Sequence, residues 1–327
     1  MKALRGSVCL ALIAALCSGA GSAQESADAY PSKPVTVVVP YAAGGPNDLE
    51  MRLYATKLNA ALGQPFLLEF KPGAGGAIGN AYVAKAKPDG YTLLLQAGGF
   101  TILPAFSKRL PYDSVKDLAP VSLMSKRASV LVANPSFAPK SFSDYVAFAK
   151  SNPGKVNFGT TGIGSTAHLA GAWIDSATGT KTTFVHYKGL GPLLLELVGG
   201  QLDVAPSGLL SAMPLIKSGK LRPIALMEDR RSRLLPDVPT VQEQGVPGFN
   251  SVLWIGISAP AATPQVIINK LSDELAKVAR LPDVIATLEA EGSSLVGSTP
   301  AQFRQLIVTE IGRWQKIVQE AGIKVDE

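Results

Sequence analysis

The chain has 327 residues and a formal net charge of +6, from 31 basic and 25 acidic side chains. The basic residues are scattered rather than gathered in a stripe with aromatic side chains, which excludes a nucleic-acid-binding protein. The only cysteines, Cys9 and Cys17, lie in an N-terminal segment that we expect to be removed, so we expect no disulfide. Because only two histidines remain as strong metal ligands, we also expect no metal site, and we expect no cofactor.

The first 23 residues have the pattern of a secretory signal peptide. Two basic residues precede a short apolar run at 8–16, and a small-residue cleavage pattern (GSA) follows at 21–23. The apolar run is well below the ~20 residues that a membrane-spanning helix needs. Leu16 precedes Cys17 where a lipid-attachment site would have a small residue, so we expect a soluble, cysteine-free mature chain rather than a lipoprotein.

Strand and helix patterns alternate through the first part of the mature chain. The β-branched run at 35–39 is typical of a buried strand, and the apolar residues spaced by three and four along 51–62 are typical of a helix with one buried face. The predicted elements are a strand at 35–39, a helix at 51–62, a strand at 66–70, a helix ending near Lys87 and a strand at 91–96. This order predicts a parallel sheet with right-handed crossovers.

The alternation resumes near residue 129. The predicted elements are a strand at 129–133, a helix at 142–151, a strand at 156–158, a helix at 165–177, a strand at 182–187, a helix through Val198, and strands at 202–205, 221–227 and 252–258. Two long helices follow. Thr263 is the predicted N-cap of the first, with proline at its first helical position, and Thr299 with Gln302 forms the capping-box pattern of the second.

These elements predict an α/β fold of two lobes, each a mostly parallel sheet flanked by helices, with a ligand cleft between the lobes. We expect lobe 1 to comprise residues 24–125 and 251–327. Lobe 2, residues 126–250, is then an insertion that is joined to lobe 1 by two crossings at a hinge.

Two glycine-rich turns, 40–48 (PYAAGGPND) and 159–168 (GTTGIGSTAH), each follow a predicted strand and open a predicted helix. This geometry points backbone N–H groups and a helix N-terminus at one place, which favours an anion. A third such turn occupies 71–79, and all three lie at the carboxyl edge of their strands, where ligands bind in open α/β sheets. None matches a dinucleotide or P-loop fingerprint. The alternative is that they are only tight connections.

Several side chains in these segments have both a structural and a functional interpretation. Asp48 either holds the first turn or binds a polar ligand group. Ser165 and Thr166 can cap the following helix and also donate hydroxyls to a carboxylate. Tyr41 either forms part of the cleft wall or contacts the ligand. His186 lies at a strand end and is either a structural residue or a ligand contact.

Ser165 and His168 lie one helical turn apart, which raises the alternative of a secreted hydrolase. The chain has no G-x-S-x-G elbow around Ser165, and nothing marks an acidic partner for His168. We therefore predict that the chain is not an enzyme and has no catalytic residues.

Short motifs occur in a fixed order along essentially the whole mature chain. They are YPSKP at 30–34, the turns at 40–48 and 71–76, PDGYT at 88–92, GIGS at 162–165 followed by His168, YKG at 187–189, GQLD at 200–203, LPDVPT at 235–240 and AP at 259–260. Together they resemble the Bug family, the extracytoplasmic solute receptors of tripartite tricarboxylate transporters.

The resemblance implies a two-lobed periplasmic-binding-protein (clamshell) fold that captures a small mono- or dicarboxylate. In this family a ligand carboxylate is pinched between the two glycine turns by backbone N–H groups and hydroxyls. Carried over by position, with distal contacts added, the expected ligand-binding residues are Tyr41, Ala43, Gly44, Gly45, Asn47, Asp48, Gly98, Thr160, Thr161, Gly162, Gly164, Ser165, Thr166, His186, Tyr187 and Ser207.

The resemblance also implies a periplasmic location and a partnership with the membrane components of such a transporter, and we expect a monomer. An orphan carboxylate receptor that feeds a sensor system is an alternative with the same fold. The chain departs from the family pattern at His186, where proline is usual, at Tyr41, where phenylalanine is frequent, and at 204–207. These departures leave the identity of the ligand open.

Overall fold

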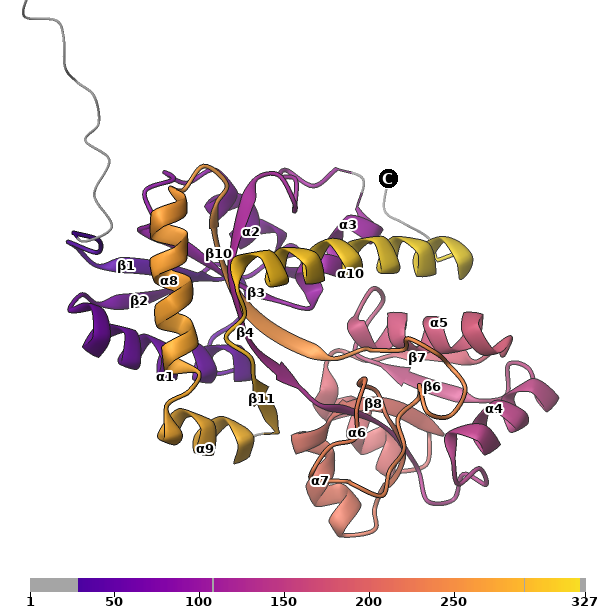
Figure 1. The fold of residues 1–327 in the computed structure, drawn as a ribbon. Helices are drawn as coiled ribbons and strands as arrows, with labels where there is room; N and C mark the ends of the chain where they lie inside the picture. Colours follow the sequence, from indigo (N-terminus) through magenta and orange to yellow (C-terminus); the bar gives the residue numbers. More distant parts are fainter. Residues whose placement is uncertain (1–28, 108, 291, 324–327) are drawn as a thin grey trace, which may run out of the picture. The chain divides into compact units, whose positions relative to one another are not determined.

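In the computed structural model, the described residues are 29–107, 109–290 and 292–323. The predicted signal peptide, with both cysteines, lies outside these residues. From Pro31 onward the chain forms one compact unit with two β-sheets and helices packed around them (Figure 1). Among the helices of the described residues, none is both long enough and apolar enough to cross a bilayer.

The first sheet has six strands. They are β1 (Val35–Val39), β2 (Phe66–Phe70), β3 (Thr92–Ala97), β4 (Leu118–Arg127), β10 (Leu253–Pro260) and β11 (Ser293–Leu295). In the order β11-β4-β10-β3-β1-β2, β1 pairs in parallel with β2 and β3, whereas β10 is antiparallel to both β3 and β4. The short strand β11 adds an antiparallel edge to β4.

The second sheet has five strands. They are β5 (Ser129–Ala133), β6 (Asn157–Thr160), β7 (Thr183–His186), β8 (Val204–Gly208) and β9 (Arg222–Leu226). In the order β7-β6-β8-β5-β9, β6 is parallel to β7 and β8, and β5 is antiparallel to β8 and β9.

The two-lobed α/β class is confirmed, but the expectation that each sheet is mostly parallel is wrong. Among the described strands, two of the five pairings in the first sheet and two of the four in the second are parallel. The reason lies in β4, which the sequence patterns did not predict. Only Ala128 separates β4 from β5, so this chain segment runs directly from the first sheet into the second, and β10 returns beside it in the opposite direction (Figure 1).

Ten α-helices and one 3-10 turn are described. They are α1 (Pro46–Leu62), η1 (Ala74–Gly76), α2 (Ala77–Ala84), α3 (Gly99–Phe106), α4 (Phe142–Ser151), α5 (Thr166–Thr178), α6 (Leu190–Val198), α7 (Leu209–Lys217), α8 (Gln265–Val278), α9 (Pro282–Ala290) and α10 (Pro300–Glu320). The capping box of Thr299 and Gln302 is confirmed at the start of α10. The predicted cap of α8 is wrong by one residue, because Pro264 takes the N-cap position and leaves Thr263 outside the helix.

The strands of the two sheets come from separate parts of the chain. Every strand of the second sheet lies between Ser129 and Leu226, and the first sheet takes its strands from before and after that segment. The lobe boundaries at 125/126 and 250/251 stay a prediction; β4 itself runs two residues past the first of them.

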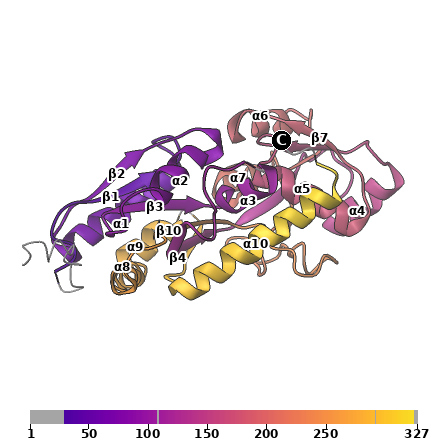
Figure 2. The same cartoon turned by 90° about the horizontal axis from the view of Figure 1, so that it is seen from above.

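Helix α10 links the two sheets. It contacts β4 and α3 near the first sheet and also α5, which follows β6 of the second (Figure 2). Side chains of α3, α5 and α10 share one apolar cluster, in which Ile102, Leu169 and Trp314 are buried. This cluster connects α3 with α5, and both elements border the cleft described next.

Candidate functional site

The turn after β1 is held by Asp48. Its side chain is 4% exposed, one carboxylate oxygen accepts the Gly44 N–H at 2.8 Å, and the other lies 2.7 Å from Nε of Arg52. Gly44 has φ +82°, a conformation that few other residues adopt without strain. The structure therefore gives Asp48 the loop-holding role.

The turn after β6 leads into the N-terminus of α5. Ser165 is the N-cap of α5, and its Oγ accepts the backbone N–H of His168 at 3.2 Å. The turn needs glycine at two places, because Gly162 has φ +129° and Gly164 has φ +73°. We call residues 160–166 the second-lobe turn.

The turn after β2 packs closely against the turn after β1. A Cβ placed on Gly79 would lie 2.8 Å from Cβ of Pro40, so only glycine allows this approach. Ala74, in the same turn, has φ +47° and is the one non-glycine residue with positive φ among the described residues. We call residues 73–79 the first-lobe turn, since it projects into the cleft where the turn after β1 does not.

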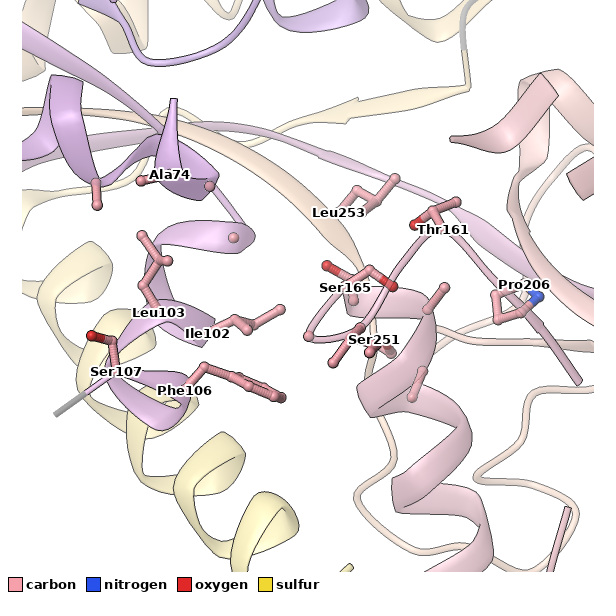
Figure 3. Close-up of a pocket in the computed structure, with 18 of the residues that line it drawn as sticks. Ala74, Ile102, Leu103, Phe106, Ser107, Thr161, Ser165, Pro206, Ser251 and Leu253 are labelled. Atoms are coloured by element: carbon pink, nitrogen blue, oxygen red, sulfur yellow. The ribbon is translucent and has the colours of Figure 1, made fainter. Parts of the chain in front are cut away.

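A cleft of about 1130 Å³ lies between the two groups of elements (Figure 3). One wall comes from the first-lobe turn and from α3, and the opposite wall comes from the second-lobe turn and the start of α5. Figure 3 shows Ile102 and Phe106 projecting from α3 toward the turn that carries Ser165. The floor contains Ser129, Ser251 and Leu253, which lie at or next to the strands that pass between the sheets.

The structure brings part of the predicted site together at this cleft. The predicted residues that line it are Thr161, Gly164, Ser165, Thr166 and Ser207. The predicted residues that do not line it are Tyr41, Ala43, Gly44, Gly45, Asn47, Asp48, Gly98, Thr160, Gly162, His186 and Tyr187. Most of the second-lobe contacts are thus at the cleft, and the turn after β1 is set back from it.

Some of the remaining predicted residues stand directly behind the cleft wall. Burial raises the pKa of the Tyr41 hydroxyl, which is hydrogen-bonded to the backbone of Ala97 and lies 3.8 Å from the Cβ position of Gly99, a cleft residue. A Cβ on Gly98 would lie 3.9 Å from Oγ1 of Thr166. Tyr41 therefore supports the segment that enters α3.

The two histidines meet behind the second-lobe turn. Their rings are 4.9 Å apart and nearly perpendicular, and Nδ1 of His186 lies 2.6 Å from Oγ1 of Thr160. Nδ1 of His168 accepts the Gly164 N–H at 3.2 Å. Burial, with a smaller effect of His186, lowers the pKa of His168 to about 4, and partial burial lowers that of His186.

This arrangement does not support the hydrolase alternative. Nδ1 of His168 already accepts a hydrogen bond from the Gly164 N–H. Ser165 Oγ accepts the main-chain N–H of His168 and does not donate to the His168 ring. A general base must lie within hydrogen-bond reach of the hydroxyl that it deprotonates. No group of three or more His, Cys, Asp or Glu side chains within the described ranges is arranged to hold a metal ion.

Sequence reasoning missed most of the first-lobe wall. The missed cleft residues include Ala74, Ile78, Ile102, Leu103, Phe106, Leu253 and Met227. Two signals were available. The 71–79 segment was recognised as a glycine-rich turn at the right edge, and an unbroken apolar run follows Gly98 and Gly99.

A buried carboxyl group lies next to the cleft floor. Met227 lines the cleft and is hydrogen-bonded through its backbone to Ser129 and Ser251, and the side chain of Glu228 is 9% exposed. Burial raises the pKa of Glu228 to about 7, a shift that Lys126 and Arg230 reduce. A buried carboxylate of this kind costs stability when it is ionised.

Glu228→Gln is expected to raise the free energy of unfolding by about 2–3 kcal/mol at pH 8. The unfolded carboxyl titrates near pH 4.5 and the folded one near 7, so the wild-type protein loses stability as the pH rises between these values. Below pH 4.5 the carboxyl group is protonated in both the folded and the unfolded state, so the substitution should no longer raise the free energy of unfolding. Urea unfolding at pH 4, 6 and 8 measures it, with Glu289→Gln, an exposed glutamate of α9, as the control. An equal gain at all three pH values contradicts the assignment.

Comparison with known proteins identifies a family of receptors and several related proteins. The family model described as "Tripartite tricarboxylate transporter family receptor" matches residues 51–323. A protein of Agrobacterium vitis, named for the TAR-I ttuE-ttuC' intergenic region, is 40% identical over 91% of this chain and 87% of its own length. Protein BugT of Bordetella pertussis is 36% identical over 97% of this chain and 98% of its own length.

Solved structures show the same fold. Rpa4515 of R. palustris, determined with adipate, is 31% identical with a TM-score of 0.77 and covers 91% of this chain and 100% of its own. MatC of Rhodopseudomonas palustris, determined with bound malate, is 33% identical with a TM-score of 0.73 and covers 88% of this chain and 100% of its own.

Proposed function

The chain belongs to the tripartite tricarboxylate transporter receptor family, and we propose that it captures a small mono- or dicarboxylate in the periplasm for uptake by the membrane components of such a transporter. As a member of this family it is a solute-binding receptor and not an enzyme. Two related proteins were determined with adipate and with malate, which supports a carboxylate as the ligand.

The observation that carries the proposal is the second-lobe turn facing the cleft. Thr161, Ser165 and Thr166 line the cleft at the N-terminus of α5, where backbone N–H groups and the helix dipole favour negative charge. Ser165 Oγ accepts from His168, so its own proton is free to donate outward. Each charge-assisted hydrogen bond to a carboxylate contributes ~1.5–3 kcal/mol.

The first lobe completes the site in this proposal. The cleft of about 1130 Å³ is larger than the roughly 300–1,000 Å³ usual for small-molecule sites, so we expect the lobes to close over the ligand. Closure about the strands that pass between the sheets would bring the turn after β1, from Tyr41 to Asp48, toward the carboxylate. In this proposal Tyr187 would then shape the distal end of the site, and His186 would act on the ligand through Thr160, which its ring contacts from behind the second-lobe turn.

Thermal unfolding with a ligand panel tests the proposal. A carboxylate present at about 100 times its Kd should stabilise the mature protein by ~2.7 kcal/mol, which raises Tm by several degrees, and the matched neutral amide should not. The panel pairs each carboxylate with its amide at equal ionic strength. Stabilisation by amides but by no carboxylate would rule the proposal out.

A further inference from the structure

We propose that the ligand of this receptor is an amphipathic monocarboxylate, with one carboxylate head and an unbranched aliphatic body, rather than a hydroxylated di- or tricarboxylate. This inference rests on the proposed function and narrows its substrate class. It follows from how polar, charged and apolar side chains are divided between the walls of the cleft.

The polar end of the cleft is the second-lobe turn. Thr161, Ser165 and Thr166 lie together there, and within the described residues the Thr161 and Thr166 hydroxyls have no hydrogen-bond partner. Two hydroxyls elsewhere in the cleft are already committed, since Ser129 donates to the Ser251 carbonyl at 3.0 Å and Ser207 to the Gly208 carbonyl at 3.1 Å. Ser107, at the end of α3, and Ser251, on the floor, also carry hydroxyls in the cleft. Among the described cleft residues, only the second-lobe turn combines unengaged hydroxyls with a helix N-terminus, which suits one carboxylate.

The wall opposite the second-lobe turn is apolar. α3 presents Ile102, Leu103 and Phe106 to the cleft, and the first-lobe turn adds Ile78. The Ile78 side chain is 55% exposed, which is unusual for an isoleucine that forms part of a built cavity wall. Leu103 and Phe106 on the same wall are half-buried and Ile102 is 4% exposed, so the wall is a built apolar surface, and an apolar wall of this kind favours an apolar ligand group.

The apolar surface extends around the polar end as well. Ile163, at the tip of the second-lobe turn, lines the cleft and is 71% exposed, and Leu253 on the floor is 37% exposed. A ligand with an apolar body between the walls would give these side chains apolar contacts. A ligand that carries hydroxyls along its length would leave those hydroxyls unpaired against isoleucine, leucine and phenylalanine, which costs free energy.

Charge argues against a second carboxylate on the ligand. Among the described cleft residues Arg109 is the only one with a charged side chain, and it is exposed. An exposed guanidinium keeps its water and attracts an anion weakly. The second carboxylate of a dicarboxylate would lose water against the apolar wall without a buried partner.

Calorimetric titration of the mature protein with acetate, butyrate and hexanoate tests this. Each added methylene should lower Kd about fourfold, as expected for a CH₂ group transferred from water to an apolar site. Hexanoate should bind more tightly than adipate, which has the same carbon count and a second carboxylate, and more tightly than malate. Malate or adipate binding tenfold more tightly than hexanoate overturns the inference but leaves the proposed function standing. Failure of every carboxylate overturns both.

Two variants locate the apolar contact. Ile78→Thr and Ile163→Thr keep the β-branched shape on exposed side chains, so both should fold, and each should reduce the gain per methylene to about twofold. Val308→Thr, at a 45% exposed position on α10 away from the cleft, is the matched control and should keep the fourfold gain. A full fourfold gain in both cleft variants would overturn the inference. So would a tenfold loss of hexanoate affinity in Arg109→Gln, since that would place the ligand at the exposed cation.

Discussion

Glu50→Ala is expected to lower the free energy of unfolding by about 3–5 kcal/mol, because it breaks a buried ion pair from one side. Glu50 lies on α1 with a side chain that is 0% exposed, and its carboxylate is 2.8 Å from the Arg127 guanidinium. Arg127 is itself only 13% exposed, and its Nε donates to Ser293 at 3.2 Å. The variant removes the counter-charge that Glu50 supplies and leaves the guanidinium buried.

The same pair joins α1 to the end of β4. Glu50 follows Asp48 in the first turns of α1, while Arg127 ends β4 just before the chain enters the second sheet. Chemical denaturation of the mature protein at pH 7 measures the loss. Glu69→Ala is the control, because Glu69 pairs with Lys71 at the surface, where such pairs contribute about 0–1 kcal/mol. A loss for Glu50→Ala no larger than for the control would contradict the argument.

The overall class could be predicted because local patterns and tertiary structure agree. The β-branched run of β1 is found where the sequence places it, and α1 ends at Leu62 as predicted, although it begins earlier than predicted, at Pro46. The mixed sheets could not be predicted in the same way. β4 contains Pro120, a residue that argues against a central strand, and its antiparallel partner β10 lies more than a hundred residues later.

The residues of the second-lobe wall could be predicted from the sequence, whereas most residues of the first-lobe wall could not. The second-lobe turn is contiguous, so its cap, its glycines and its hydroxyls could be recognised together from residues 160–166. The first-lobe wall is assembled by packing. Which glycine turn projects into the cleft depends on the close approach of Gly79 to Pro40 and on the position of α3 against α10. No local pattern encodes either contact.

The double substitution Thr161→Val with Thr166→Val is expected to weaken binding of the preferred carboxylate by about 100-fold or more. Each valine keeps the shape of the threonine and removes one hydroxyl, and two charge-assisted hydrogen bonds of ~1.5–3 kcal/mol each account for a loss of this size. In the described part of the structure neither hydroxyl is engaged by another protein group, so the folded state should lose little.

Calorimetric titration of the double variant and of the wild-type protein measures this loss, and Tm without ligand shows whether the fold is kept. Thr36→Val in β1, which does not line the cleft, is the matched control and should bind as the wild-type protein does. The hydroxyls are the part of the donor set that a side-chain substitution can remove, since the backbone N–H groups of the turn stay in place. An affinity within threefold of wild type would therefore mean that the backbone alone holds the carboxylate, or that it binds at the turn after β1 instead.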